Sequence, residues 1–119
     1  MRKTMIENSV HELNNLISEG KILKAFHTYY HDNVVMQENE AAPTIGKEAN
    51  RQRELHSFGN ISEFRKAEVM GMAVGENQSY VTWHFDYIHK EWGLRNYTQI
   101  AVQTWKDGKI IKEQFFYSL

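Results

Sequence analysis

The chain has 119 residues, a length that corresponds to a single domain, residues 1–119, with a hydrophobic core of its own. Fourteen Lys and Arg against fifteen Asp and Glu give a net charge of −1 without a basic run, so we expect neither a nucleic-acid partner nor a membrane partner. The absence of cysteine excludes disulfides, a thiolate nucleophile and cysteine-bound metal, and it fits a cytoplasmic protein. No continuous apolar segment near the N-terminus has the length of a signal peptide or a membrane span.

Two helices are expected at the start of the chain. Apolar residues recur at helical spacing from about residue 4 to 18, and this helix ends at Gly20. A second helix covers about residues 21–30, with an apolar stripe that includes Phe26 and Tyr29. A short β-prone run, residues 34–37, follows it.

A third helix is expected from Lys47 to about Ser57, after a polar loop that holds Pro43 and ends at Gly46. At about 100° per residue, one sector of this helix contains Ala49, Gln52, Leu55 and His56. We therefore expect Gln52 and His56 to face inward.

The second half of the chain has the pattern of antiparallel strands. The expected strands are residues 61–72, 79–89, 97–105 and 110–117. In the second of these, large apolar residues alternate with polar ones, which predicts an apolar face packed on the helices; they are Val81, Trp83, Phe85 and Tyr87. Helices followed by a run of strands indicate an α+β fold.

The last two strands are joined at Asp107-Gly108, the strongest local signal for a hairpin turn. Alternation in the last strand places Glu113 on one face with three large apolar residues, Ile111, Phe115 and Tyr117. The residues beside that face depend on the register. A two-residue turn brings Ile100 and Val102 there, whereas a bulge at Gly108 brings Gln99, Ala101 and Gln103.

Several segments in this order resemble one superfamily: a helix pair split by Gly20, residues 26–36, Pro43 and Gly46 before a helix, and residues 105–110 near the end. With them the chain resembles the nuclear transport factor 2-like superfamily, and within it the SnoaL-like and ketosteroid isomerase-like group. The resemblance implies a cone of three N-terminal helices packed in a strongly curved, mixed or antiparallel β-sheet, a cystatin-like roll. It also implies a pocket in the open end of the cone and a homodimer formed through the outer sheet face.

The resemblance does not imply steroid isomerisation. Ketosteroid isomerases use an Asp base with a Tyr and a protonated Asp as oxyanion donors. In this chain the matching positions hold Gln37, Leu13 and Ala101. The acid that SnoaL-type relatives often carry near the end of the last strand is also missing, because residues 115–118 read Phe-Phe-Tyr-Ser.

Glu113 is the first candidate for acid–base chemistry, since a carboxyl among apolar groups loses hydration and is easier to protonate. The structural alternative is a half-exposed Glu113 paired with a Lys or Arg. His56 is the second candidate, and its alternative is a helix-end histidine packed on the sheet. Glu38 follows the position of the isomerase base and is read as a loop carboxylate unless a bulge turns it inward.

The candidate ligand-binding residues are of two kinds. Tyr30 and Gln52 could orient a ligand through hydrogen bonds. The aromatic side chains that would form the pocket wall are Trp83, Phe85, Phe115 and Tyr117. Their alternative role is packing in the core.

No metal and no cofactor are expected. His27 and His31 stand four residues apart without the neighbouring acid of metalloprotease helices, and they are interpreted as surface histidines. His84 and Asp86 share the polar face of their strand, where interface hydrogen bonding is the preferred interpretation.

Two functions remain open at this point. The first is a protein that binds a small, largely apolar molecule, with metal-free acid–base chemistry of the isomerase, cyclase or dehydratase type. The second is a non-catalytic ligand-binding or dimeric association module. A pocket filled by its own side chains is the third reading, and the sequence does not decide whether the chain is an enzyme.

Overall fold

The computed structural model describes residues 2–118 of the chain. Within that range it contains three helices and six strands, which confirms the predicted α+β class. The elements are α1 (Arg2–Ser18), α2 (Ile22–Tyr29), β1 (Tyr30–Glu38), β2 (Thr44–Ile45), α3 (Lys47–Phe58), β3 (Ile61–Val74), β4 (Gln78–His89), β5 (Gly93–Lys106) and β6 (Lys109–Tyr117). No helix in this part of the chain is long and apolar enough to cross a membrane.

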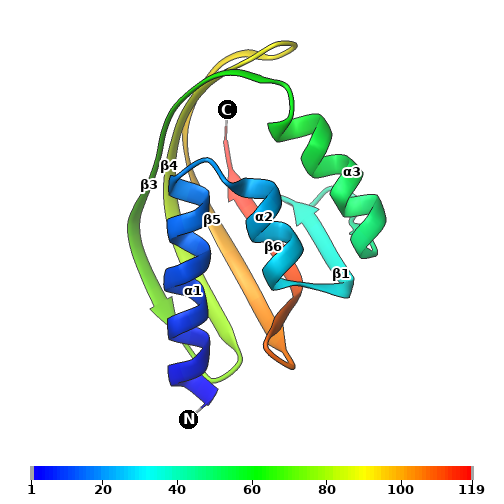
Figure 1. Cartoon of the computed structure of the whole chain (residues 1–119), viewed down its shortest axis with the longest axis vertical. Helices are drawn as coiled ribbons and strands as arrows, with labels where there is room; N and C mark the ends of the chain where they lie inside the picture. The colour runs from blue at the N-terminus through cyan, green and yellow to red at the C-terminus, as the bar shows by residue number, and fades with distance from the viewer. Residues whose placement is uncertain (1, 119) are drawn as a thin grey trace.

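The strands form one mixed sheet in the order β2-β1-β6-β5-β4-β3. β1 runs parallel to β6, and the other neighbouring pairs are antiparallel. The helices lie against one side of this sheet, and the long strands β3 and β4 curve towards α3 at the top of the view (Figure 1). β1 begins directly after α2, at Tyr30 instead of the predicted Val34. Tyr30 pairs with Ile110, so the end of α2 lies beside the start of β6.

The core lies between the helices and the inner face of the sheet. The predicted apolar face of β4 is confirmed, because all four alternating residues are buried: Val81, Trp83, Phe85 and Tyr87. Val10 and Leu13 of α1 are buried as well. Alternation in β4 and helical periodicity in α1 therefore meet in one apolar layer.

Gly20 ends α1 as the sequence predicts. Its φ of +80° is a left-handed conformation that glycine adopts without a steric cost. The Gly20 amide donates to the Ile17 carbonyl at 2.9 Å, and the Lys21 amide donates to the Leu16 carbonyl at 2.8 Å. This pattern is a Schellman motif, which reverses the chain so that α2 starts at Ile22.

The β5–β6 hairpin decides the surroundings of Glu113. Asp107 and Gly108 both have positive φ, 54° and 77°, and Lys106 pairs with Lys109 across a two-residue turn. One extra residue, Ile111, then interrupts the pairing between the Trp105–Ile110 pair and the Thr104–Lys112 pair. The bulge is thus at Ile111 and not at Gly108.

This bulge produces one of the two registers that the sequence left open. Gln103 stands opposite Glu113, Ala101 opposite Phe115 and Gln99 opposite Tyr117. The assignment of Ile111 to the face of Glu113 is wrong, because the extra residue inverts the alternation and buries Ile110 instead.

The inner face of α3 also differs from the expectation. Its buried residues are Asn50 and Glu54, whereas Gln52 and His56 are exposed. The Asn50 amide explains why this side of α3 faces inward. Its Nδ2 donates to the backbone carbonyls of Val34, Thr44 and Gly46 at 2.8–3.2 Å. A helix whose inner face is polar shows no apolar stripe, so periodicity selects the wrong sector.

Candidate functional site

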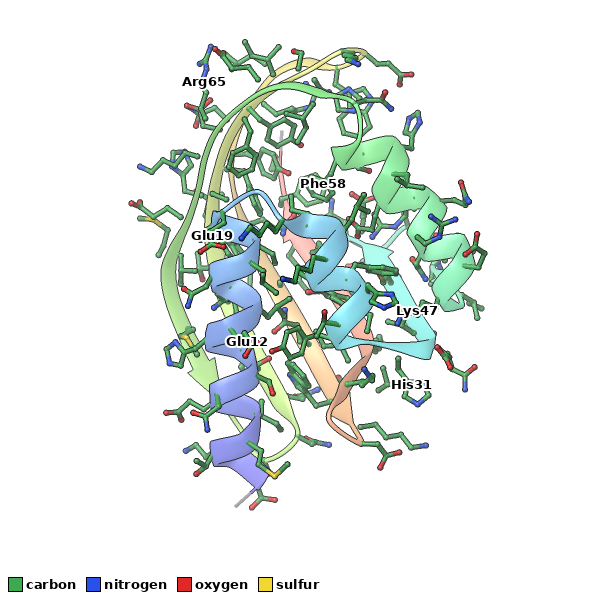
Figure 2. All side chains as sticks on the ribbon, in the orientation of Figure 1. Glu12, Glu19, His31, Lys47, Phe58 and Arg65 are labelled. Atoms are coloured by element: carbon green, nitrogen blue, oxygen red, sulfur yellow. The ribbon has the colours of Figure 1, made fainter. Side chains whose placement is uncertain are left out.

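A cavity of about 250 Å³ lies between the helices and the inner face of β4, β5 and β6. Its wall is rich in aromatic side chains: Phe26, Trp83, Phe85, Trp92, Tyr97, Phe115 and Tyr117 are among the lining residues. The charged lining residues are Glu38, Arg53, Glu54, Arg95 and Glu113. Figure 2 shows how side chains from α2, α3 and the sheet converge in this region. The cavity thus combines an apolar surface with a few ionisable groups, the usual make-up of a small-molecule site.

Glu113 is the most enclosed carboxyl of the cavity, with 2 % of its surface exposed. Both carboxyl oxygens accept hydrogen bonds, Oε1 from the Tyr30 hydroxyl and Oε2 from Gln103 Nε2 at 2.8 Å. Burial raises the pKa of Glu113 above its ordinary value, while the two hydrogen bonds and the Arg53 charge oppose the increase. Burial and Glu113 itself raise the pKa of Tyr30 well above its ordinary value, so Tyr30 keeps its proton.

A buried chain of hydrogen bonds holds Gln103 in place. The Trp105 indole donates to Ser79 Oγ at 2.8 Å, and Ser79 Oγ donates to Gln103 Oε1 at 2.6 Å. Because an indole N–H can only donate, the direction of each bond along this chain is determined. Gln103 must therefore present its N–H group, and not its carbonyl, to Glu113.

A second charged cluster surrounds Arg53 of α3. Its Nη1 lies 3.3 Å from Glu38 Oε2 and its Nη2 lies 3.2 Å from Glu54 Oε1. The hydroxyl of Tyr117 donates to the other Glu38 oxygen at 2.6 Å. Burial raises the pKa of Glu54 to about 7; Arg53 opposes the increase, and the charges of Glu113 and Glu38 add to it. Glu54, 5 % exposed, can therefore gain or lose a proton near neutral pH.

Two tyrosines complete the polar part of the wall. The hydroxyls of Tyr87 and Tyr97 lie 3.3 Å apart. Burial raises the pKa of both groups above the ordinary value, so they remain neutral hydrogen-bond donors and acceptors.

The structure brings six of the eight residues predicted for the site to this cavity. They are Glu113, Tyr30, Trp83, Phe85, Phe115 and Tyr117. His56 and Gln52 are not among the lining residues. The His56 side chain is 56 % exposed and lies 3.2 Å from Glu91, while Gln52 donates to Glu48 at 3.1 Å on the outer side of α3.

Five polar groups of the site were missed or not chosen by sequence reasoning, and one of them, Arg95, was not considered at all. Glu54 lies outside the sector of α3 that periodicity selected, Arg53 was not assigned to either side, and Gln103 belonged to only one of the two open registers. Glu38, taken as a loop carboxylate, ends β1 and lines the cavity with 46 % of its side chain exposed. The spacing of Asn50 and Glu54, one helical turn apart, was the signal that could have identified the inner face.

The positions that matched the isomerase catalytic groups have other roles here. Gln37 donates to the Ala41 carbonyl at 2.9 Å in the loop after β1, and Leu13 is part of the core. Ala101 lines the cavity but carries no ionisable group. None of the three can take part in proton transfer.

Residues 2–118 contain no group of three or more His, Asp or Glu side chains arranged to hold a metal ion. The pair considered on β4 is engaged separately, with His84 Nε2 2.7 Å from Asn96 Oδ1 and Asp86 3.6 Å from Arg65.

This combination of three helices, a mixed six-stranded sheet and a cavity between them is that of the nuclear transport factor 2-like superfamily. More narrowly, the chain belongs to the SnoaL-like domain family, whose model matches residues 4–117, and the predicted resemblance is confirmed. No match was found among curated proteins.

Three crystal structures illustrate the similarity. A protein from Mesorhizobium loti assigned as a SnoaL-like polyketide cyclase shares 27 % identity over 94 % of this chain and 98 % of its own, with a TM-score of 0.83. A protein of the same assignment from Jannaschia sp. CCS1 shares 12 % identity over 98 % and 87 % of the two chains, with a TM-score of 0.80. A nuclear transport factor 2-like protein of unknown function from Burkholderia xenovorans LB400 shares 18 % identity over 99 % and 86 %, with a TM-score of 0.78. The last two support the fold alone.

Proposed function

We propose that the cavity binds a small, largely apolar molecule and that Glu113 exchanges a proton with it. The observation that carries this proposal is a buried carboxyl of raised pKa at the wall of a cavity rich in aromatic side chains. Perturbed carboxyls in enclosed cavities are typical of acid–base sites. The polyketide cyclase assignment of the Mesorhizobium loti relative supports the same kind of chemistry.

The volume limits the size of the ligand. An engineered cavity of about 150 Å³ holds benzene, and typical ligand pockets begin at about 300 Å³. The cavity of about 250 Å³ lies between these values and therefore favours a molecule of one or two rings.

The arrangement around Glu113 suits proton transfer without a metal. A protonated Glu113 donates to the ligand, and the carboxylate that remains is stabilised by the hydrogen bonds from Tyr30 and Gln103. Glu54, with a pKa of about 7, is the second group that can accept or return a proton. Isomerisation, cyclisation and dehydration all require such a transfer beside a carbonyl or hydroxyl group.

The second candidate function is a non-catalytic binding module. It is favoured by the fact that both Glu113 oxygens already accept hydrogen bonds from the protein. In that case the carboxyl orders Tyr30 and Gln103 around the cavity and does not react.

A deuterium-exchange experiment separates the two functions. Benzylacetone, one aromatic ring with a methyl ketone, is incubated with the protein in D₂O, and NMR follows exchange of the protons next to the carbonyl. Catalysis predicts exchange with the wild type and loss of at least about 100-fold with Glu113→Gln. Glu91→Gln, which alters a carboxyl outside the cavity, should keep full activity. Saturable binding without exchange would support the binding module.

We also propose a homodimer formed through the outer face of the sheet. Ile100 and Phe116 are neighbours across β5 and β6 on this face and are 44 % and 39 % exposed. Thr98 and His84 pair beside them on β5 and β4, whereas Tyr97 points to the cavity. A contiguous apolar area on an open sheet favours association. Sedimentation at micromolar concentration should give a dimer that Ile100→Lys converts to a monomer; a wild-type monomer would contradict the proposal.

A further inference from the structure

Arg95 lies on β5 opposite Tyr87 and lines the cavity near the β4–β5 turn. Its Nη1 donates to the backbone carbonyls of Trp92 and Leu94 at 3.0 and 3.3 Å. The guanidinium carbon lies 5.6 Å from the centre of the Trp92 ring. Two carbonyls and an aromatic face thus hold this half-buried cation in one orientation.

The remaining edge of the Arg95 guanidinium has no acceptor within residues 2–118. Neither Nε nor Nη2 of Arg95 makes a hydrogen bond or ion pair there. In Arg53, by contrast, Nε donates to Asn50, Nη1 to Glu38 and Nη2 to Glu54. The Nε–Nη2 edge is the fork that binds a carboxylate with two parallel hydrogen bonds. Arg51 binds Glu48 in this manner on the outside of α3.

A further donor lies close to Arg95. Arg95 and Tyr87 are paired directly across β5 and β4, and the Tyr87 hydroxyl is 3.3 Å from that of Tyr97. When one of these hydroxyls donates to the other, the second still has an O–H proton without an acceptor in the described structure. An anionic oxygen beside Arg95 would provide that acceptor.

The acids of the cavity do not compete for Arg95. Glu38 and Glu54 share Arg53, and Glu113 accepts from Tyr30 and Gln103. Arg95 is therefore the cavity cation whose charge is not matched by a protein carboxylate within the described residues.

We propose that the ligand is a carboxylic acid with an apolar body, whose carboxylate binds the Nε–Nη2 edge of Arg95 while the body lies against the aromatic wall. This inference rests on the proposed function and specifies its ligand class. The carboxylate is fixed where the cavity meets the half-exposed Trp92. The apolar part points away from that end, towards Phe85 and Trp83 on the neighbouring strand.

The test compares an acid with its uncharged amide. Isothermal titration calorimetry at pH 7 measures the binding of 3-phenylpropionate and 3-phenylpropanamide to the wild type and to Arg95→Gln. The wild type should bind the acid at least about tenfold more tightly, which corresponds to about 1.4 kcal/mol. Arg95→Gln should lose this preference and keep the affinity for the amide within about twofold. Arg95→Lys, which retains the charge but not the fork, should keep part of the preference.

Arg65→Gln is the matched control, because it removes the same charge from a side chain that points away from the helices, as Figure 2 shows for Arg65. It should leave both affinities unchanged. If the wild type binds acid and amide equally, or if Arg95→Gln weakens both equally, the carboxylate inference is overturned while the proposed function stands. If the wild type binds neither compound, the proposed apolar-ligand cavity fails, and the inference fails with it.

Discussion

Gln103 and Glu113 stand directly opposite each other on β5 and β6, and the Gln103 amide donates a 2.8 Å hydrogen bond to the Glu113 carboxyl. The pair exists because Ile111 bulges out of β6 and shifts the register by one residue. Ser79 fixes the Gln103 amide by donating to its Oε1, and the Trp105 indole donates to Ser79 in turn. A binding or catalytic role for Glu113 would therefore depend on residues that do not line the cavity.

Ser79→Ala should destabilise the protein and change the titration of Glu113. The substitution leaves the buried Trp105 indole without an acceptor, which costs about 1–3 kcal/mol. It also frees Gln103 to rotate, so the Glu113 pKa should rise further as its charged form loses a donor. Urea unfolding and ¹³C NMR titration of glutamate-labelled protein measure the two effects. Ser62→Ala, which removes an exposed 3.2 Å hydrogen bond to Ile88, should change stability by less than about 0.5 kcal/mol.

Tyr30→Phe should raise the pKa of Glu113 above its wild-type value. The Tyr30 hydroxyl donates to the carboxylate and so favours the charged form, and Phe keeps the ring but removes this donor. The Glu113 midpoint in the same NMR titration should move to higher pH. Tyr80→Phe is the control, since the exposed Tyr80 hydroxyl binds only Gln78, at 2.6 Å. An unchanged or lower midpoint in Tyr30→Phe would show that Tyr30 does not control the charge of Glu113.

Glu54→Gln should stabilise the protein increasingly as the pH rises. The pKa of Glu54 is about 7 in the folded protein against 4.5 ordinarily, so the folded state binds the proton more tightly. The stability that this proton gives is complete below about pH 4.5 and is lost as the pH rises through about 7. The Gln variant has no proton to lose at this position, so its stability does not fall for this reason as the pH rises. The difference in unfolding free energy, Gln variant minus wild type, should grow by about 3 kcal/mol between pH 4 and pH 8.

The measurement for Glu54 is urea unfolding at both pH values, in which the contributions of groups that do not interact with Glu54 cancel between variant and wild type. Glu76→Gln, in the exposed β3–β4 turn, is the control for the loss of a carboxyl outside the cavity. A flat difference for Glu54→Gln would mean that Glu54 is ionised throughout this range.

Asn50→Asp should be more damaging than Asn50→Ala. The Asn50 amide donates to three backbone carbonyls, so an isosteric carboxylate would place acceptors against acceptors in a fully buried site. We expect a loss of about 3 kcal/mol or more for Asp at pH 7 and about 1–3 kcal/mol for Ala. Thermal unfolding gives the comparison, and Asn77→Asp in the exposed turn should have little effect. Equal losses would indicate that the Asn50 donor is not needed.

The amino-acid sequence by itself determined the three helices, the four strands of the second half and the face of the last strand on which Glu113 lies. Apolar spacing in α1, alternation in β4, Gly20 and Asp107-Gly108 are local signals, and each depends on residues within a few positions of one another. They were sufficient for the α+β class, while the resemblance to the superfamily implied the pocket, which six of the eight residues predicted for the site line.

Only the tertiary structure decided which polar groups share the cavity. Tyr30 and Glu113 are 83 positions apart in the chain, and their hydrogen bond requires the parallel pairing of β1 with β6. The polar inner face of α3 has no apolar period to reveal it, because Asn50 is buried to satisfy carbonyls of other segments. Arg53 and Arg95 are the same residue type, but in the described structure carboxylates lie beside Arg53 and backbone carbonyls lie beside Arg95. Buried polar groups are stable only when distant partners complete their hydrogen bonds, so their placement follows from the assembled fold and not from local pattern.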